Sequence, residues 1–321
     1  MRSLTVPAGC APMRLDVFLA RQVPHGSRRV AQRAIAGGAV RINGRRARKG
    51  QTLAAGDTVE VPDALYAPAL LAPNPALAVP ILFEDAALIA LDKPAGMPSH
   101  ALRADETGTV ANFLLARHPE LAAVGKGGLE AGIVHRLDTD TSGVLLAART
   151  AEAYQALRRQ FSRREVTKEY VALVHGDLAA AGEVSNPIAP ERHNRRKMRV
   201  CRVASRAPDA RPAVTSYRPV ERFGSSTLLA VQIPTGVTHQ IRVHLASIGH
   251  PVVGDRLYGA RAGADAASRH MLHACCLTVT HPVGGAPVRI SSPLPADFRA
   301  VLERLRSQAR AADAGNAGRR P

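Results

Sequence analysis

The chain has 321 residues, of which 46% are hydrophobic and 21% charged, the balance of an ordinary globular protein with room for one large and one small domain. It contains no run of about 18 apolar residues and no apolar stretch near its start, so we expect neither a membrane-spanning helix nor a secretory signal. The net charge of +17 indicates a polyanionic partner, and the 3% aromatic content argues against a broad stacking surface for single-stranded bases.

Residues 13–62 are predicted to form a small basic module of two helices followed by short strands. Apolar residues recur at helical spacing over residues 15–23, and Ser27 is the expected N-cap of a second helix over residues 28–36. Asn43-Gly44 predicts a type I′ hairpin turn between two strands. Four arginines are candidate contacts to a polyanion: Arg28, Arg29, Arg33 and Arg41. A solvated charged helix face is the alternative explanation for Arg29 and Arg33.

A stretch rich in Pro and Ala, residues 63–79, is predicted to link this module to a larger domain over residues 80–305. The larger domain is expected to open with a strand pair and a stiff loop that begins at Lys93. Lys93 could hold a phosphate, or it could pair with Glu84 or Asp85. Residues 306–321 are expected to form a disordered tail.

A polar loop between the apolar runs Ile133-Val134 and Val144–Ala147 is the most informative stretch of the chain. Apolar runs of this length predict buried strands, and a loop held between buried strands is a rigid platform for reactive groups. The loop presents His135, Arg136 and Asp138 within a few residues. A surface turn with an Arg–Asp pair is the alternative interpretation.

Three segments follow this loop in the larger domain. Residues 152–164 predict an amphipathic helix with arginines on its polar side, and residues 168–176 predict a strand with Tyr170 near its start. Packing is the commoner role for a tyrosine in a strand. Residues 191–222 are strongly basic, which favours hairpin strands with mobile loops facing a polyanion.

Residues 235–251 fit a helix with Thr238 as its N-cap and Gly249 just past its end. Alternating polarity also fits a strand, but the length and the caps favour the helix. The candidate site residues in this stretch are His239, Gln240 and Arg242.

A cluster of His and Cys residues near residue 275 suggests zinc only superficially, because its spacing matches no paired-ligand pattern. We therefore expect core packing there and no metal site. The cysteines form no CxxC motif, so we expect reduced thiols in a cytoplasmic protein. The four are Cys10, Cys201, Cys275 and Cys276.

The string His135-Arg136-Leu137-Asp138-x-x-Thr141-Ser142-Gly143 resembles the signature of the RluA-type pseudouridine synthases. Three further stretches resemble motifs of the same family: Lys93–Gly96, Lys168–Gly176 and Thr235–His244. Residues 13–62 resemble an S4 RNA-binding domain. One departure is Val237, which stands where the family usually has arginine.

The resemblance implies an α+β fold in which a small S4 domain is joined to a larger catalytic domain with a mixed, mostly antiparallel sheet, flanking helices and a central cleft. It implies conversion of specific uridines to pseudouridine in structured RNA, with 23S ribosomal RNA expected because of the S4 domain. The isomerisation consumes no redox equivalents, so no cofactor is expected. We also expect a monomer without membrane contact.

Site roles follow from the same resemblance. Asp138 would be the essential aspartate, Arg242 the cation beside it and Tyr170 the tyrosine of the uridine pocket. Arg136 would fill the space vacated by the flipped base. The remaining expected substrate contacts are His135, Lys93, His239, Gln240 and the four arginines of the S4 domain. Whether Asp138 attacks C1′, attacks C6 or removes the 2′ proton stays open at this stage.

Two other functions compete with this hypothesis. A catalytically silent RNA-binding or ribosome-assembly factor is favoured only by Val237. A metal-dependent nucleic-acid hydrolase would use His and Asp ligands and would lose activity in chelator.

Overall fold

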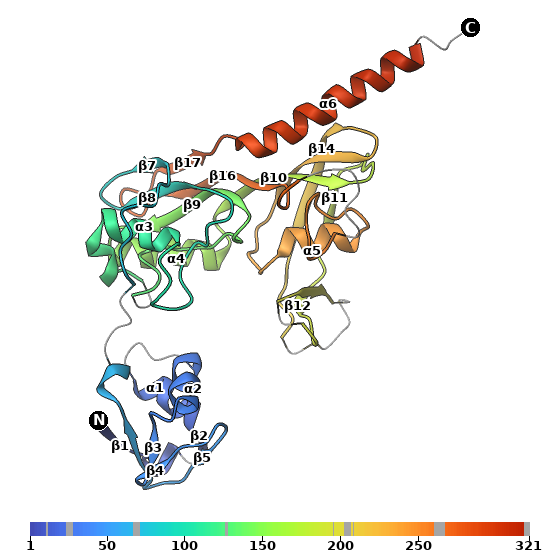
Figure 1. The fold of residues 1–321 in the computed structure, drawn as a ribbon. Helices are drawn as coiled ribbons and strands as arrows, with labels where there is room; N and C mark the ends of the chain where they lie inside the picture. The colour runs from blue at the N-terminus through green and yellow to red at the C-terminus, as the bar shows by residue number, and fades with distance from the viewer. Residues whose placement is uncertain are drawn as a thin grey trace.

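The computed structural model describes residues 1–10, 12–23, 28–66, 71–125, 128–194, 196–201, 207, 209–259 and 267–317, with the side chains of Arg29 and residues 312–317 left undescribed. The chain forms two units, each with a hydrophobic core of its own (Figure 1). The first core lies between Val6 and Val61, and the larger one between Leu71 and Ile290. No helix among these described residues is long and apolar enough to cross a bilayer.

The N-terminal unit packs two helices against a small antiparallel sheet. The helix predicted over residues 28–36 has those bounds, while its expected cap Ser27 lies outside the described residues. Asn43 and Gly44 have φ angles of 49° and 77°, which confirms the type I′ turn. The elements are α1 (Leu15–Gln22), α2 (Arg28–Ala36), β3 (Arg41–Ile42), β4 (Arg45–Arg46) and β6 (Thr58–Val61), with β2 (Met13–Arg14) paired to β5 (Thr52–Leu53).

This unit begins before the predicted start at residue 13. Strand β1 (Arg2–Thr5) pairs with β6 in the register Arg2 to Val61, which adds an edge strand to the sheet order β1-β6-β3-β4. Because β1 has little apolar character beyond Leu4, its sequence gave no strand signal. Two short 3₁₀ helices flank the unit, at Ala8–Cys10 and Asp63–Leu65.

The larger unit is built on a nine-stranded sheet, and its mixed, mostly antiparallel character confirms the predicted fold class. Only the contact between β16 and β9 is parallel, at His273 to Ser142. The strands in spatial order are β11 (Gly182–Val184), β14 (Thr215–Arg222), β15 (Ser226–Gln232), β10 (Thr167–His175), β16 (Leu272–Thr280), β9 (Ser142–Ala148), β8 (Leu88–Lys93) and β7 (Ile81–Glu84), and β17 (Pro287–Ser291) also pairs with β16.

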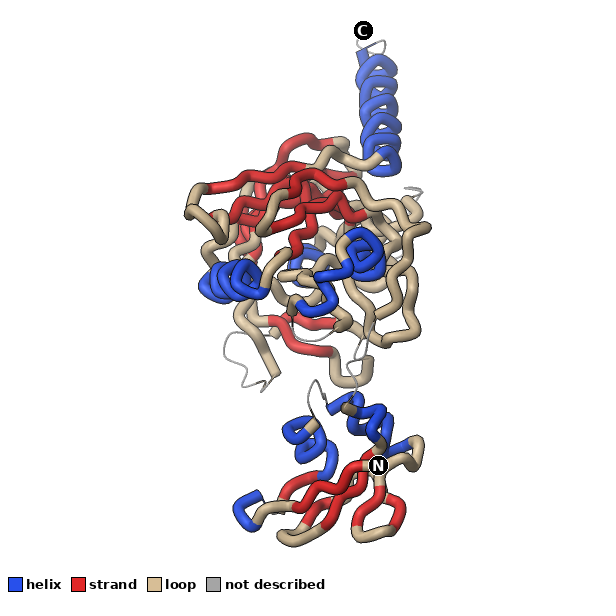
Figure 2. Tube along the Cα trace, turned by 90° about the vertical axis from the view of Figure 1, so that its left-hand side faces the viewer, coloured by secondary structure: helices blue, strands red, loops and turns tan. Residues whose placement is uncertain are grey.

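Helices α3 (Val110–Arg117), α4 (Ala151–Arg163) and α5 (Gln240–Ser247) lie on one side of this sheet (Figures 1 and 2). Thr109 and Thr150 cap α3 and α4 with their side chains. A 3₁₀ helix follows α3 at Pro119–Ala123. The hairpin of β12 (Ile188–Pro190) and β13 (Met198–Val200) lies beyond α5 (Figure 1). Strand β13 falls within the basic region 191–222 that we predicted to hold hairpin strands, whereas β12 precedes it.

Three predicted boundaries differ from the structure. Ile133 forms only an isolated bridge with Ala147 and does not start a strand. The second half of the predicted linker belongs to the larger core, because Leu71 and Val79 are buried there. The tail predicted to be disordered from residue 306 instead continues α6 (Ala296–Ala317) through Ala317, and residues 318–321 are not described. Leu305 is the last buried residue of α6 among those whose side chains are described.

Candidate active site

The loop from His135 to Thr141 leaves and re-enters the core at neighbouring points. The Val134 N–H donates to the Leu146 carbonyl at 3.1 Å, so the two stems of the loop are hydrogen-bonded to each other. Within the loop, the Thr141 N–H donates to the Asp138 carbonyl at 3.0 Å and closes a turn. The Asp138 carboxylate is therefore presented by a short, closed loop and keeps 19% of its side chain exposed.

Side chains behind the loop hold its backbone in place. Lys93 Nζ donates to the Thr139 carbonyl at 2.9 Å, and Arg269 donates to the Asp140 carbonyl at 3.0 Å. His270 and the Thr141 hydroxyl are 2.8 Å apart. Because these partners come from β8 and from the residues before β16, the loop is fixed by the sheet itself.

Gly143 is the residue that lets β9 approach β16. Its φ is +115°, and a Cβ built there would lie 2.2 Å from the Ala274 carbonyl oxygen. Only glycine fits this combination of backbone angle and close contact. The glycine in the signature therefore has a packing role that sets the position of the loop before it.

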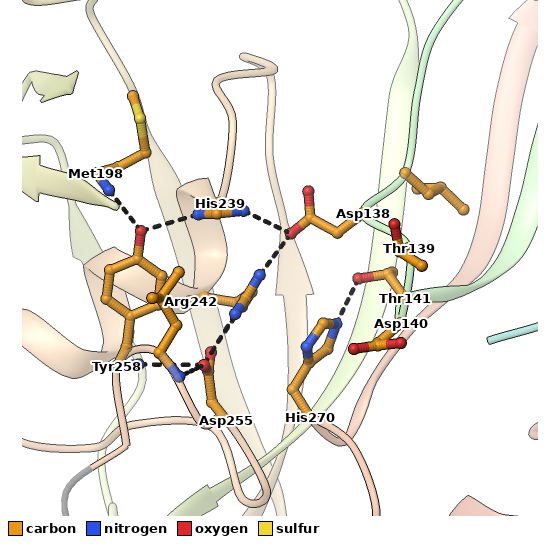
Figure 3. A network of polar contacts seen from close by, with 12 residues as sticks. Asp138, Thr139, Asp140, Thr141, Met198, His239, Arg242, Asp255, Tyr258 and His270 are labelled. Carbon is orange, nitrogen blue, oxygen red and sulfur yellow. Dashed lines mark hydrogen bonds and ion pairs between the residues drawn. The ribbon is translucent and has the colours of Figure 1, made fainter. Parts of the chain in front are cut away.

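Arg242 joins Asp138 to a second carboxylate, Asp255 (Figure 3). Arg242 Nη1 donates to Asp138 Oδ2 at 2.9 Å, while Nε and Nη2 donate to the two Asp255 oxygens at 2.6 and 2.8 Å. The bidentate contact fixes the guanidinium plane, and both carboxylates raise the pKa of Arg242 even though burial lowers it. A permanent positive charge therefore lies in hydrogen-bond contact with the Asp138 carboxylate.

His239 approaches the same Asp138 oxygen that Arg242 contacts. Its Nε2 lies 3.8 Å from Asp138 Oδ2, and its Nδ1 lies 2.9 Å from the Tyr258 hydroxyl (Figure 3). Burial lowers the pKa of His239, which keeps the ring neutral at pH 7. The Tyr258 oxygen also accepts the Met198 N–H at 2.7 Å, so the β12–β13 hairpin is hydrogen-bonded to this network.

A cavity of about 370 Å³ opens in front of Asp138. Tyr170 and Arg242 line it together with Asp138, so the structure brings the three predicted catalytic residues to one pocket. Burial and the Asp138 charge raise the pKa of Tyr170, which therefore stays protonated at neutral pH. Other lining residues include Arg136, Phe161, Lys168, Ile233, Val237, His239 and Leu272.

The predicted substrate contacts fall into two groups. Arg136 lines the pocket with an exposed side chain, and its guanidinium forms no ion pair with the residues that the structure describes. His135 lines it too, but its Nε2 accepts the Leu146 N–H at 3.1 Å, and its ring stacks on Phe161 at 4.9 Å. Burial lowers the pKa of His135 to about 3, so the ring is neutral.

Two expected contacts are structural instead. Lys93 is fully buried, and its three N–H groups donate to the carbonyls of Pro94, Met97 and Thr139, so it reaches neither a phosphate nor Glu84 or Asp85. Gln240 is 3% exposed. Its amide nitrogen donates to the Val214 carbonyl and the Thr215 hydroxyl, and its amide oxygen accepts the Val237 N–H. Both predictions assumed that a polar residue in a motif faces the ligand.

The helix prediction for residues 235–251 is confirmed by α5, but its cap is not Thr238. His239 is the N-cap, with a φ of 57°, and Gly249 follows the helix with a φ of +87° as expected. The left-handed cap turns the His239 ring toward the pocket while Arg242 projects from the first turn (Figure 3).

The arginines of the N-terminal unit have different surroundings. Arg33 and Arg41 are exposed, whereas Arg28 donates to the buried Asp16 carboxylate at 3.2 Å. The side chain of Arg29 lies outside the described parts of the chain. A free arginine suits RNA contact better than a paired one, so Arg33 and Arg41 are the stronger candidates.

Sequence analysis did not place Asp255, Tyr258 or Lys168 in the site. A signal existed for the first two, since Gly254-Asp255-x-Leu257-Tyr258 lies shortly after Arg242 and an acid beside a predicted buried arginine is its natural partner. The signal for Lys168 was weaker: it lies two residues before Tyr170 in a predicted strand, so the two side chains are expected on the same face.

Comparison with known proteins agrees with this geometry. Residues 87–247 match the family described as RNA pseudouridylate synthase, and residues 13–59 match the S4 domain. A ribosomal large subunit pseudouridine synthase D from Xanthomonas campestris pv. campestris is 40% identical over 98% of this chain and 95% of its own length. An uncharacterized RNA pseudouridine synthase from Chloroflexus aurantiacus is 41% identical over 96% of this chain and 95% of its own.

A solved structure is similar as well. Human RNA pseudouridylate synthase domain containing 1 shares 26% identity at a TM-score of 0.57, covering 75% of this chain and 98% of its own. The family model and the relatives of about 40% identity over nearly the whole chain show the ancestry: this chain belongs to the RNA pseudouridylate synthase family.

Proposed function

We propose that the protein converts specific uridines of large-subunit ribosomal RNA to pseudouridine, with Asp138 as the catalytic residue and no cofactor. The observation that carries the proposal is the Asp138–Arg242 ion pair, held by Asp255 and open to a pocket that Tyr170 also lines. The RNA class is supported by the names of the relatives and by the S4 domain.

The reaction breaks the C1′–N1 bond, turns the uracil and joins C5 to C1′. Asp138 can attack C1′, add to C6 or take the 2′ proton, and each route needs its carboxylate ionised. Arg242 meets that need. Tyr170, which stays protonated, offers the uracil a stacking surface and a hydrogen-bond donor.

The substrate uridine must leave its stack before it reaches the pocket, at a cost of a few kcal/mol. The guanidinium of Arg136 is exposed beside the pocket and forms no ion pair with the described part of the chain, so it is suited to occupy the vacated space. Arg33 and Arg41 would contact the RNA backbone through the S4 domain. We place the reaction in the cytoplasm, because all four cysteines are free thiols, and we propose that the protein acts as a monomer.

A binding-only role is the second candidate, because Val237 lines the pocket where the family usually has arginine. The two functions separate in one experiment. Large-subunit ribosomal RNA lacking modification is incubated with the wild-type protein or Asp138→Asn, and pseudouridines are then mapped. New pseudouridine at defined positions with wild type only supports the proposal, while RNA binding without new pseudouridine supports the silent factor.

A further inference from the structure

Lys168 is an unusual cation among the buried basic residues that the structure describes. Lys93 donates to three carbonyls, Arg242 to two carboxylates, and Arg269 to Asp297 and several oxygens of the chain. Lys168 is equally buried, at 7% exposure, yet its Nζ donates only to the Thr235 carbonyl, at 2.7 Å. An ammonium has three donors, so two remain for a ligand.

The position of Lys168 directs those donors into the pocket. Residues 168 and 170 of β10 point to the same face of the strand, and both line the cavity in front of Asp138. The ammonium lies 6.0 Å from the centre of the Phe161 ring. Phe161, Ile233 and Leu272 add apolar side chains to the lining, which suits a base better than a hydrated phosphate.

The charged and titratable groups around Lys168 do not neutralise it. His135 from the loop is neutral, because burial and the positive charges of Lys168 and of Arg158 on α4 lower its pKa. No carboxylate of the described residues pairs with Lys168, and burial alone lowers its pKa to about 8. A buried, uncompensated positive charge is unfavourable in the free protein, so it is expected where a ligand brings negative charge.

We propose that Lys168 is a further catalytic residue, whose ammonium binds a carbonyl oxygen of the flipped uracil and stabilises the negative charge that the ring acquires during the reaction. This inference rests on the proposed function and adds a role that Asp138 and Arg242 do not fill.

The charge arises on each route open to Asp138. When C1′–N1 breaks, both electrons stay with N1 and spread to O2 and O4, while C1′ bonds to an Asp138 oxygen or, after C2′ has given its proton to Asp138, becomes part of a C1′=C2′ double bond. Addition of Asp138 to C6 likewise sends an electron pair toward O4. The ring then bonds through C5 to C1′. In this step the Asp138 oxygen leaves C1′ on the first route, C2′ takes its proton back from Asp138 on the second, and Asp138 leaves C6 at the end of the third, while the C5 proton passes to water. Lys168 keeps its three protons throughout and acts as a fixed donor in a dry site.

The test compares full-length Lys168→Met and Lys168→Arg with wild type, using tritium release from RNA labelled at uridine C5. Lys168→Met should lower the single-turnover rate at saturating RNA by roughly 10²- to 10³-fold, as loss of one such donor does elsewhere. RNA affinity, measured in the Asp138→Asn background, should change by less than about 2-fold. Arg289→Met, which removes an exposed positive charge outside the pocket, is the matched control and should leave both values unchanged.

The pH profile gives a readout that a merely structural lysine would not move. In wild type, kcat/KM should fall as the pH rises through about 8, because Lys168 then loses its proton, and in Lys168→Arg this fall should move to higher pH. The Arg variant also tests the inference should the Met variant fail to fold.

Three outcomes would overturn the role of Lys168. The first is an unchanged single-turnover rate at saturating RNA in Lys168→Met. The second is a loss of RNA affinity alone with a shallower salt dependence, which would mean that Lys168 contacts a phosphate. The third is a fall of kcat/KM at alkaline pH that is the same in Lys168→Arg and wild type. Wild type that releases no tritium would instead reject the proposed function itself.

Discussion

At the residue scale, the site depends on how Asp255 orients Arg242. Asp255 is buried and takes two of the three described hydrogen bonds of the guanidinium, so Arg242 would turn if this carboxylate were lost. Asp138, by contrast, contacts only one nitrogen of Arg242 and would not fix the plane of the guanidinium by itself. Asp255 is therefore a positioning residue that acts through Arg242.

Asp255→Asn should lower kcat by roughly 10- to 100-fold, because a small misplacement of Arg242 weakens its support of the Asp138 charge. The free energy of unfolding should fall by about 1–3 kcal/mol, because a buried charged hydrogen bond is weakened. Steady-state kinetics and urea unfolding measure the two effects. Asp177→Asn breaks an exposed pair with Arg222 and should change neither measurably, while full activity of Asp255→Asn would contradict the positioning role.

The sequence predicted which motif residues lie together, but it did not predict which polar side chains are buried against the protein. Asp138, Tyr170 and Arg242 were predicted, and the structure places all three around one pocket. Lys93 and Gln240 belong to the same motifs, yet their donors are taken up by carbonyl and hydroxyl oxygens of the protein itself. Residue type and spacing do not reveal whether a polar group faces the ligand or the chain.

At the element scale, the position of the reactive loop is set by the contact between β9 and β16. Gly143 sits at that contact with its positive φ and its close approach to Ala274. The clamps from Lys93, Arg269 and His270 then hold the loop that precedes it. Packing of the strands thus determines where Asp138 lies.

Gly143→Ala should destabilise the protein by more than about 2 kcal/mol and reduce activity further than the loss of folded protein explains, because β9 must shift. Gly224→Ala is the matched control, since its φ is +77° but nothing lies within 4 Å of the added Cβ, so only the backbone strain remains. Thermal unfolding together with tritium release measures both. Equal effects of the two substitutions would contradict the packing role.

Secondary structure was predictable where local chemistry decides it. Helices α2 and α4 and the strands β7 and β8 lie close to their predicted bounds, since caps, turns and apolar periodicity mark them. Strand β1 and the bridge at Ile133 depend on partners distant in sequence, which no local pattern reveals. For the same reason the predicted start of the larger unit, residue 80, lies too far along the chain, since the core of that unit already includes Leu71.

At the scale of the whole molecule, the S4 domain and the unit that contains the pocket each have a hydrophobic core of their own. The N-terminal unit contains its own buried residues, so its removal leaves the larger core intact. The exposed arginines Arg33 and Arg41 lie on the N-terminal unit, and the Asp138 pocket is built entirely by the larger unit.

Deletion of residues 1–62 should weaken RNA binding and flatten the dependence of affinity on salt concentration, because phosphate contacts release counterions. The larger unit should stay folded, since its core starts at Leu71. Filter binding over a range of salt concentrations, with circular dichroism as the folding control, measures the change. Equal slopes for the full and shortened proteins would show that the S4 domain does not anchor the RNA.

The central claim is that the Asp138 carboxylate carries out the chemistry. In Asp138→Asn, Arg242 keeps its bidentate contact with Asp255, so the protein should fold and bind RNA as wild type does. Single-turnover tritium release from uridine labelled at C5 is the direct measurement, made on both proteins at RNA concentrations that saturate binding. The account predicts release by wild type and none above background by Asp138→Asn, whereas equal release by the two proteins would contradict it.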